Sequence, residues 1–426
     1  MRTISWLLGL GAICAASQQS ISGPTSQPIR PTKDPWYTAP SGFEAAAPGT
    51  ILRLRAAPGN LTTDVVKNAS AAYNILYRTT DSRYKPSWAV TTIFIPMHFY
   101  VSPSGKKALL SYQVAYDSAA LDSSPSYGLY YDYDLNSIAL PSTTELITEC
   151  LNNGWVVSVP DYEGPSAAFG ASIQAGHATL DSVRAVLNLA NIYGLGNFSV
   201  GIWGYSGGSI ATEAAAELQV QYAPELNISG VVAGGVVADA PADITECNES
   251  FLAGDIVAIL LGVTVQYPEA NAYLRSRLHP ENATEFLGAL NMTTNEQLNF
   301  FFKKDIFSYF IGGMADIQAK VLQDVLNVEL KLGYHGVPAM PVFVYKAIGD
   351  EICAVSETDA LVDKFCGVGA DITYHRNTVG GHVDEIRNGQ PRVLDWLWKI
   401  FNESYVPNIS GCSIRDVTVN ITSTGL

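Results

Sequence analysis

The sequence predicts an α/β fold in which a mostly parallel central sheet, covered by helices on both faces, carries an inserted helical domain. Between residues 108 and 238, short apolar runs alternate with segments whose apolar residues recur every three or four positions, a pattern typical of strands joined by helices. This alternation stops near residue 241 and resumes at residue 340, and the stretch between has helical patterns and no good strand.

The N-terminal part of the chain predicts an extended arm followed by antiparallel strands. Residues 18–50 are rich in Pro, Ser, Gly and Thr, which favour irregular structure. Runs of alternating, β-branched or aromatic residues follow at 50–55, 71–79 and 89–95, with turn residues between them. We expect these three strands to form an antiparallel entry to the larger sheet.

The next stretch predicts the alternation of strands and helices that a parallel sheet needs. Apolar runs predict strands at 108–114, 155–159, 199–203 and 228–238. Helices are predicted at 146–153, 175–192 and 209–217, and a long loop rich in Tyr and Ser is predicted at 125–141.

The pentapeptide Gly204-Tyr205-Ser206-Gly207-Gly208 joins a predicted strand to a predicted helix. Strand, Gly-x-Ser-x-Gly and helix together are the signature of the nucleophile elbow, a tight turn that raises a serine above the sheet edge. Gly204 and Gly208 leave the space that this turn requires. In a chain rich in Gly and Ser the pattern can arise by chance, so the prediction depends on the flanking strand and helix. It indicates the α/β-hydrolase fold and makes Ser206 the candidate nucleophile.

Residues 241–334 predict an insert built of helices, at 251–265, 270–278, 295–302 and 314–332. We expect a helical cap (lid) whose abundant apolar side chains mainly pack it onto the body, while a minority line an acyl pocket. The predicted division of the chain is a signal peptide at 1–17, the first part of the core at 18–240, the cap at 241–334, and the second part of the core with a C-terminal tail at 335–426.

The sheet resumes with predicted strands at 340–347 and 370–375, followed by a closing helix at 393–402 and a tail after residue 407. Asp350 follows the first of these strands, and His382 lies in a loop after the second. The α/β-hydrolase order along the chain is serine, acid, histidine. An imidazole held in one tautomer by a carboxylate can take the proton of the serine hydroxyl. We therefore expect a triad of Ser206, Asp350 and His382.

Other residues fit the triad less well. The five remaining histidines precede the serine, lie in or beside the insert, or lie within a strand: His98, His177, His279, His335 and His375. Among the acids, Glu351 competes directly with Asp350, Asp384 is too close to His382 in sequence, and Asp359 and Asp363 fit the solvated face of a helix.

Two backbone N–H groups are expected to stabilise the oxyanion of a tetrahedral intermediate. The first belongs to Gly207, the residue after the nucleophile. The second normally follows an early strand, and the loop at 116–118 is in that place. Asp117 could donate through its backbone N–H, and a protonated carboxyl could add another donor. On the residues alone, a turn-capping role for Asp117 is equally compatible.

The N-terminus predicts export. Arg2, an apolar run at 4–14 and the small residues before Ser17 have the layout of a signal peptide, which is too short to span a bilayer, and no later run reaches the required length. Ten Asn-x-Ser/Thr sequons agree with this route. We expect a secreted, extracellular glycoprotein without a transmembrane segment.

Charge and cysteine content limit the partners. The net charge is −15 and Lys and Arg are scattered, which argues against a nucleic-acid partner. No Cys-x-x-Cys or His-x-x-x-His pattern points to a metal, and no cofactor is expected. Once Cys14 is removed with the signal peptide, five cysteines remain, which allow at most two disulfides.

Ten segments resemble the fungal secretory lipase family, the lipases similar to Candida antarctica lipase A, and they cover nearly the whole mature chain. They are Asp34-Pro-Trp-Tyr37, 48–53, 110–118, Pro125-Ser-Tyr127, 154–165, 176–182, Gly204-Tyr-Ser-Gly-Gly208, 222–226, Gly349-Asp-Glu351 and Gly381-His382.

The resemblance implies the triad of Ser206, Asp350 and His382 and an oxyanion hole formed by Asp117 and Gly207. It also implies a cap over an acyl tunnel and a disulfide between Cys366 and Cys412. The chain departs from the family in lacking a cysteine just before Pro125-Ser-Tyr127, which leaves the pairing of Cys150, Cys247 and Cys353 open. The insert matches the family least.

The expected function is hydrolysis of carboxylic esters through an acyl-enzyme on Ser206, with acylglycerols as the first expected substrates, as in a triacylglycerol lipase. One alternative is an esterase of the same architecture that removes short acyl groups from a secondary metabolite. The alternative from another class is a secreted binding module on an inactive hydrolase fold. The presence of all three triad residues argues against this last alternative.

Overall fold

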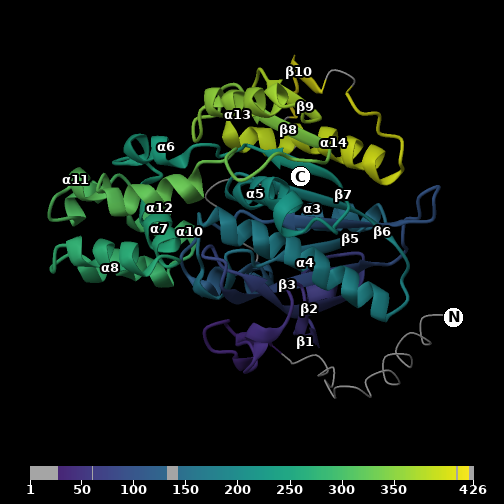
Figure 1. Cartoon of the computed structure of the whole chain (residues 1–426), viewed down its shortest axis with the longest axis horizontal. Helices are drawn as coiled ribbons and strands as arrows, with labels where there is room; N and C mark the ends of the chain where they lie inside the picture. The colour runs from purple at the N-terminus through teal and green to yellow at the C-terminus, as the bar shows by residue number, and fades with distance from the viewer. Residues whose placement is uncertain (1–26, 60, 132–142, 409–410, 422–426) are drawn as a thin grey trace.

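The computed structural model describes residues 27–59, 61–131, 143–408 and 411–421, so the predicted signal peptide at 1–17 lies outside the described residues. Figure 1 shows a twisted central sheet with helices on its faces and a group of further helices, α6 to α12, projecting from one end. No helix in the described part of the chain is long and apolar enough to cross a bilayer.

The described residues form one ten-stranded sheet with the order β1-β2-β3-β5-β4-β6-β7-β8-β9-β10. The strands are β1 (Ile51–Ala56), β2 (Ala69–Thr80), β3 (Pro86–Pro96), β4 (Lys107–Gln113), β5 (Val156–Pro160), β6 (Phe198–Tyr205), β7 (Ile228–Gly234), β8 (Val342–Ala347), β9 (Ile372–Asn377) and β10 (Cys412–Val417). The pairs β1–β2, β2–β3 and β3–β5 are antiparallel, which confirms the predicted entry. All pairings from β5 to β10 are parallel.

Helices cover both faces of the sheet, as predicted: α3 (Thr143–Asn152), α4 (Ser172–Ile192), α5 (Gly207–Tyr222), α13 (Val355–Gly367) and α14 (His382–Phe401). One hydrophobic cluster packs α4, α5 and α13 on one face, and a second packs α3 and α14 on the other. Alternate residues of β6 feed the two clusters, because side chains of a strand point to opposite faces in turn. Val200 and Ile202 belong to the first cluster, and Trp203 and Tyr205 to the second.

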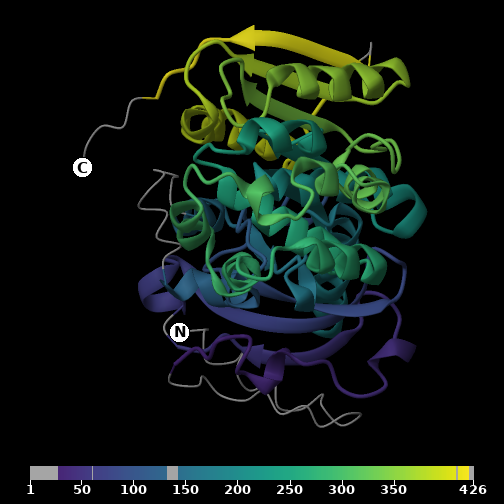
Figure 2. The same ribbon diagram turned by 90° about the vertical axis from the view of Figure 1, so that its left-hand side faces the viewer.

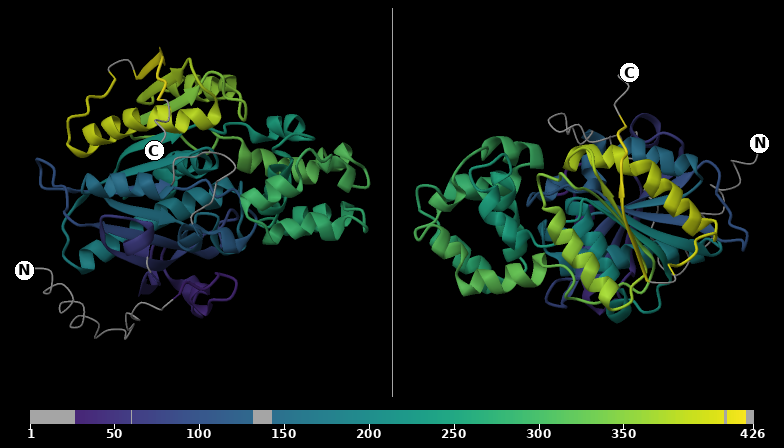
Figure 3. Two further views of the ribbon diagram at one scale, coloured as in Figure 1. Left: turned by 180° about the vertical axis from the view of Figure 1, so that it is seen from behind. Right: turned by 90° about the horizontal axis from the view of Figure 1, so that it is seen from above.

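The segment between β7 and β8 forms α6 (Ala240–Cys247), α7 (Ala253–Thr264), α8 (Pro268–Arg277), α9 (Ala283–Gly288), α10 (Thr294–Phe300), α11 (Met314–Ile317) and α12 (Lys320–Leu330), and the structure describes no strand in it. These helices share an apolar core of their own. Figure 3 shows them projecting from one end of the sheet, and Figure 2 looks onto that end, with the insert facing the viewer. The single helix predicted at 314–332 is wrong: it is divided at Ala319, whose backbone is extended.

Three further expectations differ from the structure. The loop expected at 125–141 contains α2 (Pro125–Gly128) and a short 3-10 turn, and its residues 132–141 lie outside the described part. The closing helix expected at 393–402 begins at His382, and Gly389 and Pro391 within it obscure the helical pattern. The tail forms β10, a largely exposed edge strand, so its sequence lacks the apolar run of a buried strand.

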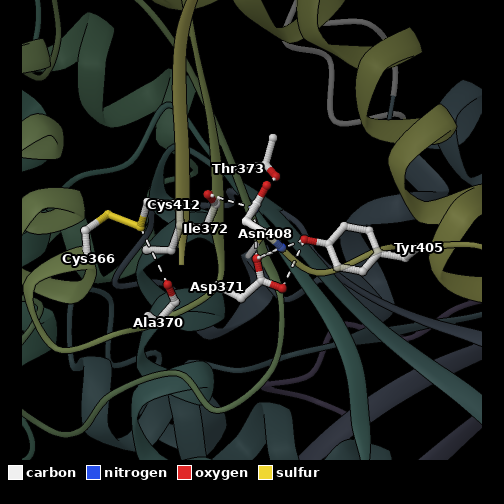
Figure 4. Close-up of a disulfide and its surroundings, with 8 residues drawn as sticks. All are labelled: Cys366, Ala370, Asp371, Ile372, Thr373, Tyr405, Asn408 and Cys412. Carbon is white, nitrogen blue, oxygen red and sulfur yellow. Dashed lines mark hydrogen bonds between the residues drawn. A yellow bond between two sulfur atoms is a disulfide. The ribbon is translucent and has the colours of Figure 1, made fainter. Parts of the chain in front are cut away.

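Strand β10 and the segment leading into it are held by two sets of contacts, shown in Figure 4. Cys366 on α13 is bonded to Cys412 on β10, which is the pair implied by the family resemblance. Beside it, the carboxylate of Asp371 accepts hydrogen bonds from Asn408 Nδ2 at 2.8 Å and from the Tyr405 hydroxyl at 3.1 Å. These contacts extend the parallel sheet beyond the strand that precedes His382.

Candidate active site

Ser206 lies at the sharp turn between β6 and α5, with a positive φ of 54° and a ψ of −127°. A non-glycine residue rarely adopts this conformation, and here the turn is held by close packing of glycines on either side. A Cβ added to Gly204 would lie 2.2 Å from the carbonyl oxygen of Gly208, and one added to Gly208 would lie 2.1 Å from that of Gln113. The side chain of Ser206 is half-buried, so it keeps a path to solvent. The turn has the geometry of the predicted nucleophile elbow.

The structure brings Ser206, His382 and Asp350 into one row of hydrogen bonds. His382 Nε2 lies 2.8 Å from Ser206 Oγ, and His382 Nδ1 lies 2.8 Å from Asp350 Oδ2. The other carboxylate oxygen, Oδ1, accepts from the backbone N–H groups of Ile352 and Cys353, both at 3.0 Å. The carboxylate therefore cannot rotate freely, and it presents one oxygen to the imidazole. This arrangement can activate a serine for nucleophilic attack.

A buried lysine supports the negative charge of Asp350. Lys346, four residues earlier on β8, is fully buried and places Nζ 3.3 Å from Asp350 Oδ2. Its Nζ also donates to the carbonyl oxygen of Val236 at 2.9 Å. Burial raises the pKa of Asp350, but the hydrogen bond and charge of His382 and the charge of Lys346 outweigh it and leave this pKa at about 2. Asp350 is therefore ionised across the physiological pH range.

Three other side chains fix the start of α14, and with it the imidazole. Glu351 accepts from the backbone N–H of His382 at 2.9 Å, and the Tyr205 hydroxyl donates to the His382 carbonyl at 2.6 Å. Asp384 accepts from the Gly381 N–H at 3.1 Å at the helix N-terminus. Glu351 and Asp384, the two competing acids, thus hold the backbone around His382 rather than its ring.

The two residues expected to supply the oxyanion donors, Gly207 and Asp117, are in contact. Gly207 is the first residue of α5, a position whose N–H has no partner within the helix. A Cβ added to Gly207 would lie 1.9 Å from Asp117 Oδ1, so the Asp117 carboxyl rests directly against this glycine. Asp117 has a positive φ of 36°, and its Oδ1 is buried without a hydrogen-bond partner among the described residues. Burial raises the pKa of this carboxyl to about 7.

The remaining candidates lie outside the row of hydrogen bonds. His375 packs edge-on against Phe343 of β8, with ring centroids 5.0 Å apart. Asp359 forms an ion pair with Arg376 at 3.2 Å, and Asp363 is exposed on α13.

One group of side chains in the described residues has the composition of a metal site: Asp350, Cys353 and His382 offer ligand atoms within 4.8 Å of one another. Two of these three residues already bond to each other through Nδ1 and Oδ2. A metal ion there would break that hydrogen bond, so the triad geometry accounts for the cluster.

Sequence reasoning missed the supporting roles of Lys346 and Glu351. The role of Lys346 could have been predicted, because it is a single cationic residue near the end of an otherwise apolar strand. Glu351 was recognised only as a competitor of Asp350.

Comparisons with known proteins show which family the chain is similar to. The family described as "Secretory lipase" matches residues 130–408. A protein of Stachybotrys chartarum named "Probable trichothecene esterase SAT6" is 50% identical, over 99% of this chain and 88% of its own length. A "Trichothecene C-3 esterase" of Fusarium sporotrichioides is 47% identical, over 98% of this chain and 93% of its own.

Among solved structures, Candida antarctica lipase A in its closed state superposes with a TM-score of 0.83 and 28% identity, covering 92% of this chain and 91% of that one. This similarity confirms the predicted α/β-hydrolase fold. The chain therefore belongs to the secretory lipase family and is a carboxylic ester hydrolase.

Proposed function

We propose that Ser206, His382 and Asp350 are the catalytic triad of this hydrolase and that Gly207 and Asp117 form its oxyanion hole. The hydrogen-bonded row from Ser206 Oγ through the His382 ring to the Asp350 carboxylate is the observation that carries this proposal. Three residues far apart in the sequence meet there in the order and geometry that serine hydrolysis needs.

In the proposed mechanism, His382 Nε2 takes the hydroxyl proton of Ser206 as Oγ attacks the ester carbonyl carbon. Asp350 keeps Nδ1 protonated and stabilises the imidazolium that forms. The backbone N–H groups of Gly207 and Asp117 donate to the oxyanion of the tetrahedral intermediate. His382 then returns its proton to the leaving alkoxide, and the acyl group stays on Ser206. Water, deprotonated by the same imidazole, releases the acid and restores the serine.

For the substrate, we propose a short acyl ester on a hydroxyl group of a secondary metabolite, with a trichothecene ester at C-3 as the first candidate. The names of the two relatives at 50% and 47% identity support this choice, and both cover nearly the whole chain. The sequence alone favoured acylglycerols and kept a short-chain esterase as the alternative. We now place that esterase first.

A triacylglycerol lipase is the second candidate. The superposition on Candida antarctica lipase A, with a TM-score of 0.83 over 92% of this chain, favours it. The two candidates share the proposed triad and differ in what the helices between β7 and β8 must accommodate. We propose that these helices, at about residues 241–334, act as a cap that selects the substrate.

Purified protein offered two substrates separates the candidates. We expect faster release of acetate from a trichothecene acetylated at C-3 than of fatty acid from a long-chain triglyceride emulsion, measured by mass spectrometry and by titration. Faster triglyceride hydrolysis would favour the second candidate. Neither reaction, in protein whose fold is verified by circular dichroism, would contradict both.

We also propose that the protein is secreted after removal of residues 1–17. The family description supports an extracellular location. N-terminal sequencing of protein from a culture medium tests the cleavage point.

A further inference from the structure

The loop that carries the second proposed oxyanion donor is held from the helical insert and not only from the sheet. Thr294, the first residue of α10, directs its hydroxyl to the carbonyl oxygen of Tyr116 at 2.6 Å. The same hydroxyl lies 3.2 Å from the carbonyl oxygen of Asp117. Gln297, one turn further along α10, donates through Nε2 to the Asp117 carbonyl at 2.8 Å. Both carbonyls that flank Asp117 therefore accept from one helix of the insert.

The bond to Tyr116 bears directly on the donor. The carbonyl of Tyr116 and the N–H of Asp117 belong to the same peptide unit, which is planar and trans, so the two groups point in opposite directions. While the Thr294 hydroxyl holds the carbonyl on the α10 side, the N–H of Asp117 has to face the other way. The Asp117 carboxyl, which lies against Gly207, marks that other side.

The backbone conformation of Asp117 makes such a restraint necessary. Its φ is +36°, in a region that L-residues with a Cβ rarely occupy because it is strained. A rotation of the Tyr116–Asp117 peptide unit would relieve the conformation and turn the N–H away from Gly207. Thr294 and Gln297 oppose this rotation, because it would remove the partner of at least one buried polar group.

The restraint is itself anchored within the insert. Gln297 is fully buried, and its Nε2 lies 3.2 Å from Asp255 Oδ1 on α7. A Cβ added to Gly254, beside Asp255, would lie 2.6 Å from the backbone carbonyl oxygen of Gln297, so α7 and α10 are in direct backbone contact. The Ser118 hydroxyl adds a further link, donating to the Met292 carbonyl just before α10 at 2.8 Å.

We infer that Thr294 is a positioning residue for catalysis: its hydroxyl orients the peptide unit whose N–H, that of Asp117, completes the oxyanion hole, and Gln297 assists it. This inference builds on the proposed function. The insert then has a part in the chemical step besides covering the site, because the oxyanion hole is complete only while α10 is docked on the 116–118 loop.

Thr294→Val tests the inference, because valine keeps the shape and loses the hydroxyl. An oxyanion-hole donor acts mainly in the transition state, so we expect kcat for a small acetate ester to fall about 10- to 100-fold with KM changed less than about threefold. Thr294→Ser retains a hydroxyl and should restore most of kcat. Gln297→Met keeps the bond to the Tyr116 carbonyl and loses those to the Asp117 carbonyl and to Asp255, so it should lower kcat less than Thr294→Val does.

Thr293→Val is the matched control. Thr293 is the N-cap of the same helix and bonds to Glu296 rather than to the 116–118 loop. Its loss should lower the melting temperature at least as much as Thr294→Val does, with kcat kept. Equal losses of kcat in the two valine variants, or a Thr294→Val enzyme with unchanged kcat, would overturn the inference and leave the proposed function intact. A folded wild-type protein that hydrolyses no ester would overturn both.

Discussion

The end of the sheet that holds the proposed triad and the neighbouring helical insert are built in different ways. In the sheet, Ser206 and Asp350 follow parallel strands directly, His382 begins the helix after another, and much of their support comes from backbone groups or neighbours in sequence. In the insert, helices pack around their own apolar core and reach the site through a few long-range polar contacts, such as that from Thr294 to Tyr116. On this difference we propose that the sheet carries the residues of the reaction, while the insert tunes the reaction and selects the substrate.

Asp350→Asn should have the largest effect on activity. An asparagine amide would favour the wrong imidazole tautomer, so we expect kcat to fall by about four orders of magnitude with little change in KM. Steady-state kinetics on a small acetate ester provide the measurement. The loss should exceed that of Thr294→Val in the insert at least tenfold. Similar losses of kcat in the two variants would contradict the proposal that the sheet edge carries the reaction and the insert only adjusts it.

Lys346→Met should lower the stability of the core. It removes a fully buried partner of Asp350 and leaves the carboxylate with fewer favourable contacts, which costs about 3–5 kcal/mol in comparable buried pairs. We expect the urea midpoint to fall accordingly and the pKa of Asp350 to rise. An unchanged midpoint would show that the contacts from His382, Ile352 and Cys353 are sufficient by themselves.

The disulfide should matter for stability alone. Cys366 and Cys412 close a loop with a sequence separation of 46 residues, so replacing both by serine should cost about 2–4 kcal/mol in unfolding free energy. Neither cysteine contacts the triad, so kcat at a temperature where the variant is folded should stay within about twofold of the wild type. A larger fall in kcat would mean that β10 influences the position of His382.

The last prediction concerns the pH dependence of stability. It compares a carboxyl of the core, Asp161, with a carboxyl of the insert, Asp255. Burial raises the pKa of Asp161 in the core to about 7 and, with the charge of Asp117, that of Asp255 in the insert to about 8. Unfolded aspartates titrate near pH 4, so between about pH 4 and 8 the folded state binds more protons and stability falls as pH rises. Asp350, with its lowered pKa, acts oppositely and loses its contribution only as the pH falls from about 4 toward 2.

We therefore expect these two groups to make the free energy of unfolding higher at pH 5 than at pH 8. Asp255→Asn should flatten this dependence, since it removes one of the groups that titrate. Stability that rises from pH 5 to pH 8 in urea titrations would contradict the argument.

The sequence predicts the sheet better than the insert for a physical reason. A tight turn after a parallel strand needs small residues, and a site at the sheet edge needs polar residues just after the strands. The sequence alone therefore reveals Gly204 and Gly208 around Ser206, and the polar residues after β8 and β9. Thr294 and Gln297 lie 177 and 180 residues from the Asp117 carbonyl that they contact. Nothing in their local pattern distinguishes them from other polar residues of an exposed helix. Likewise β10 escaped prediction because an exposed edge strand needs no apolar run.

Covalent trapping tests whether an acyl-enzyme forms on Ser206. Wild-type protein and Ser206→Ala are treated with a fluorophosphonate, and intact mass and peptide mapping locate the adduct. We expect one adduct per wild-type chain, on the peptide that contains Ser206, and neither adduct nor ester hydrolysis in the folded Ser206→Ala variant. An adduct on another residue, or ester hydrolysis by Ser206→Ala at the wild-type rate, would contradict it.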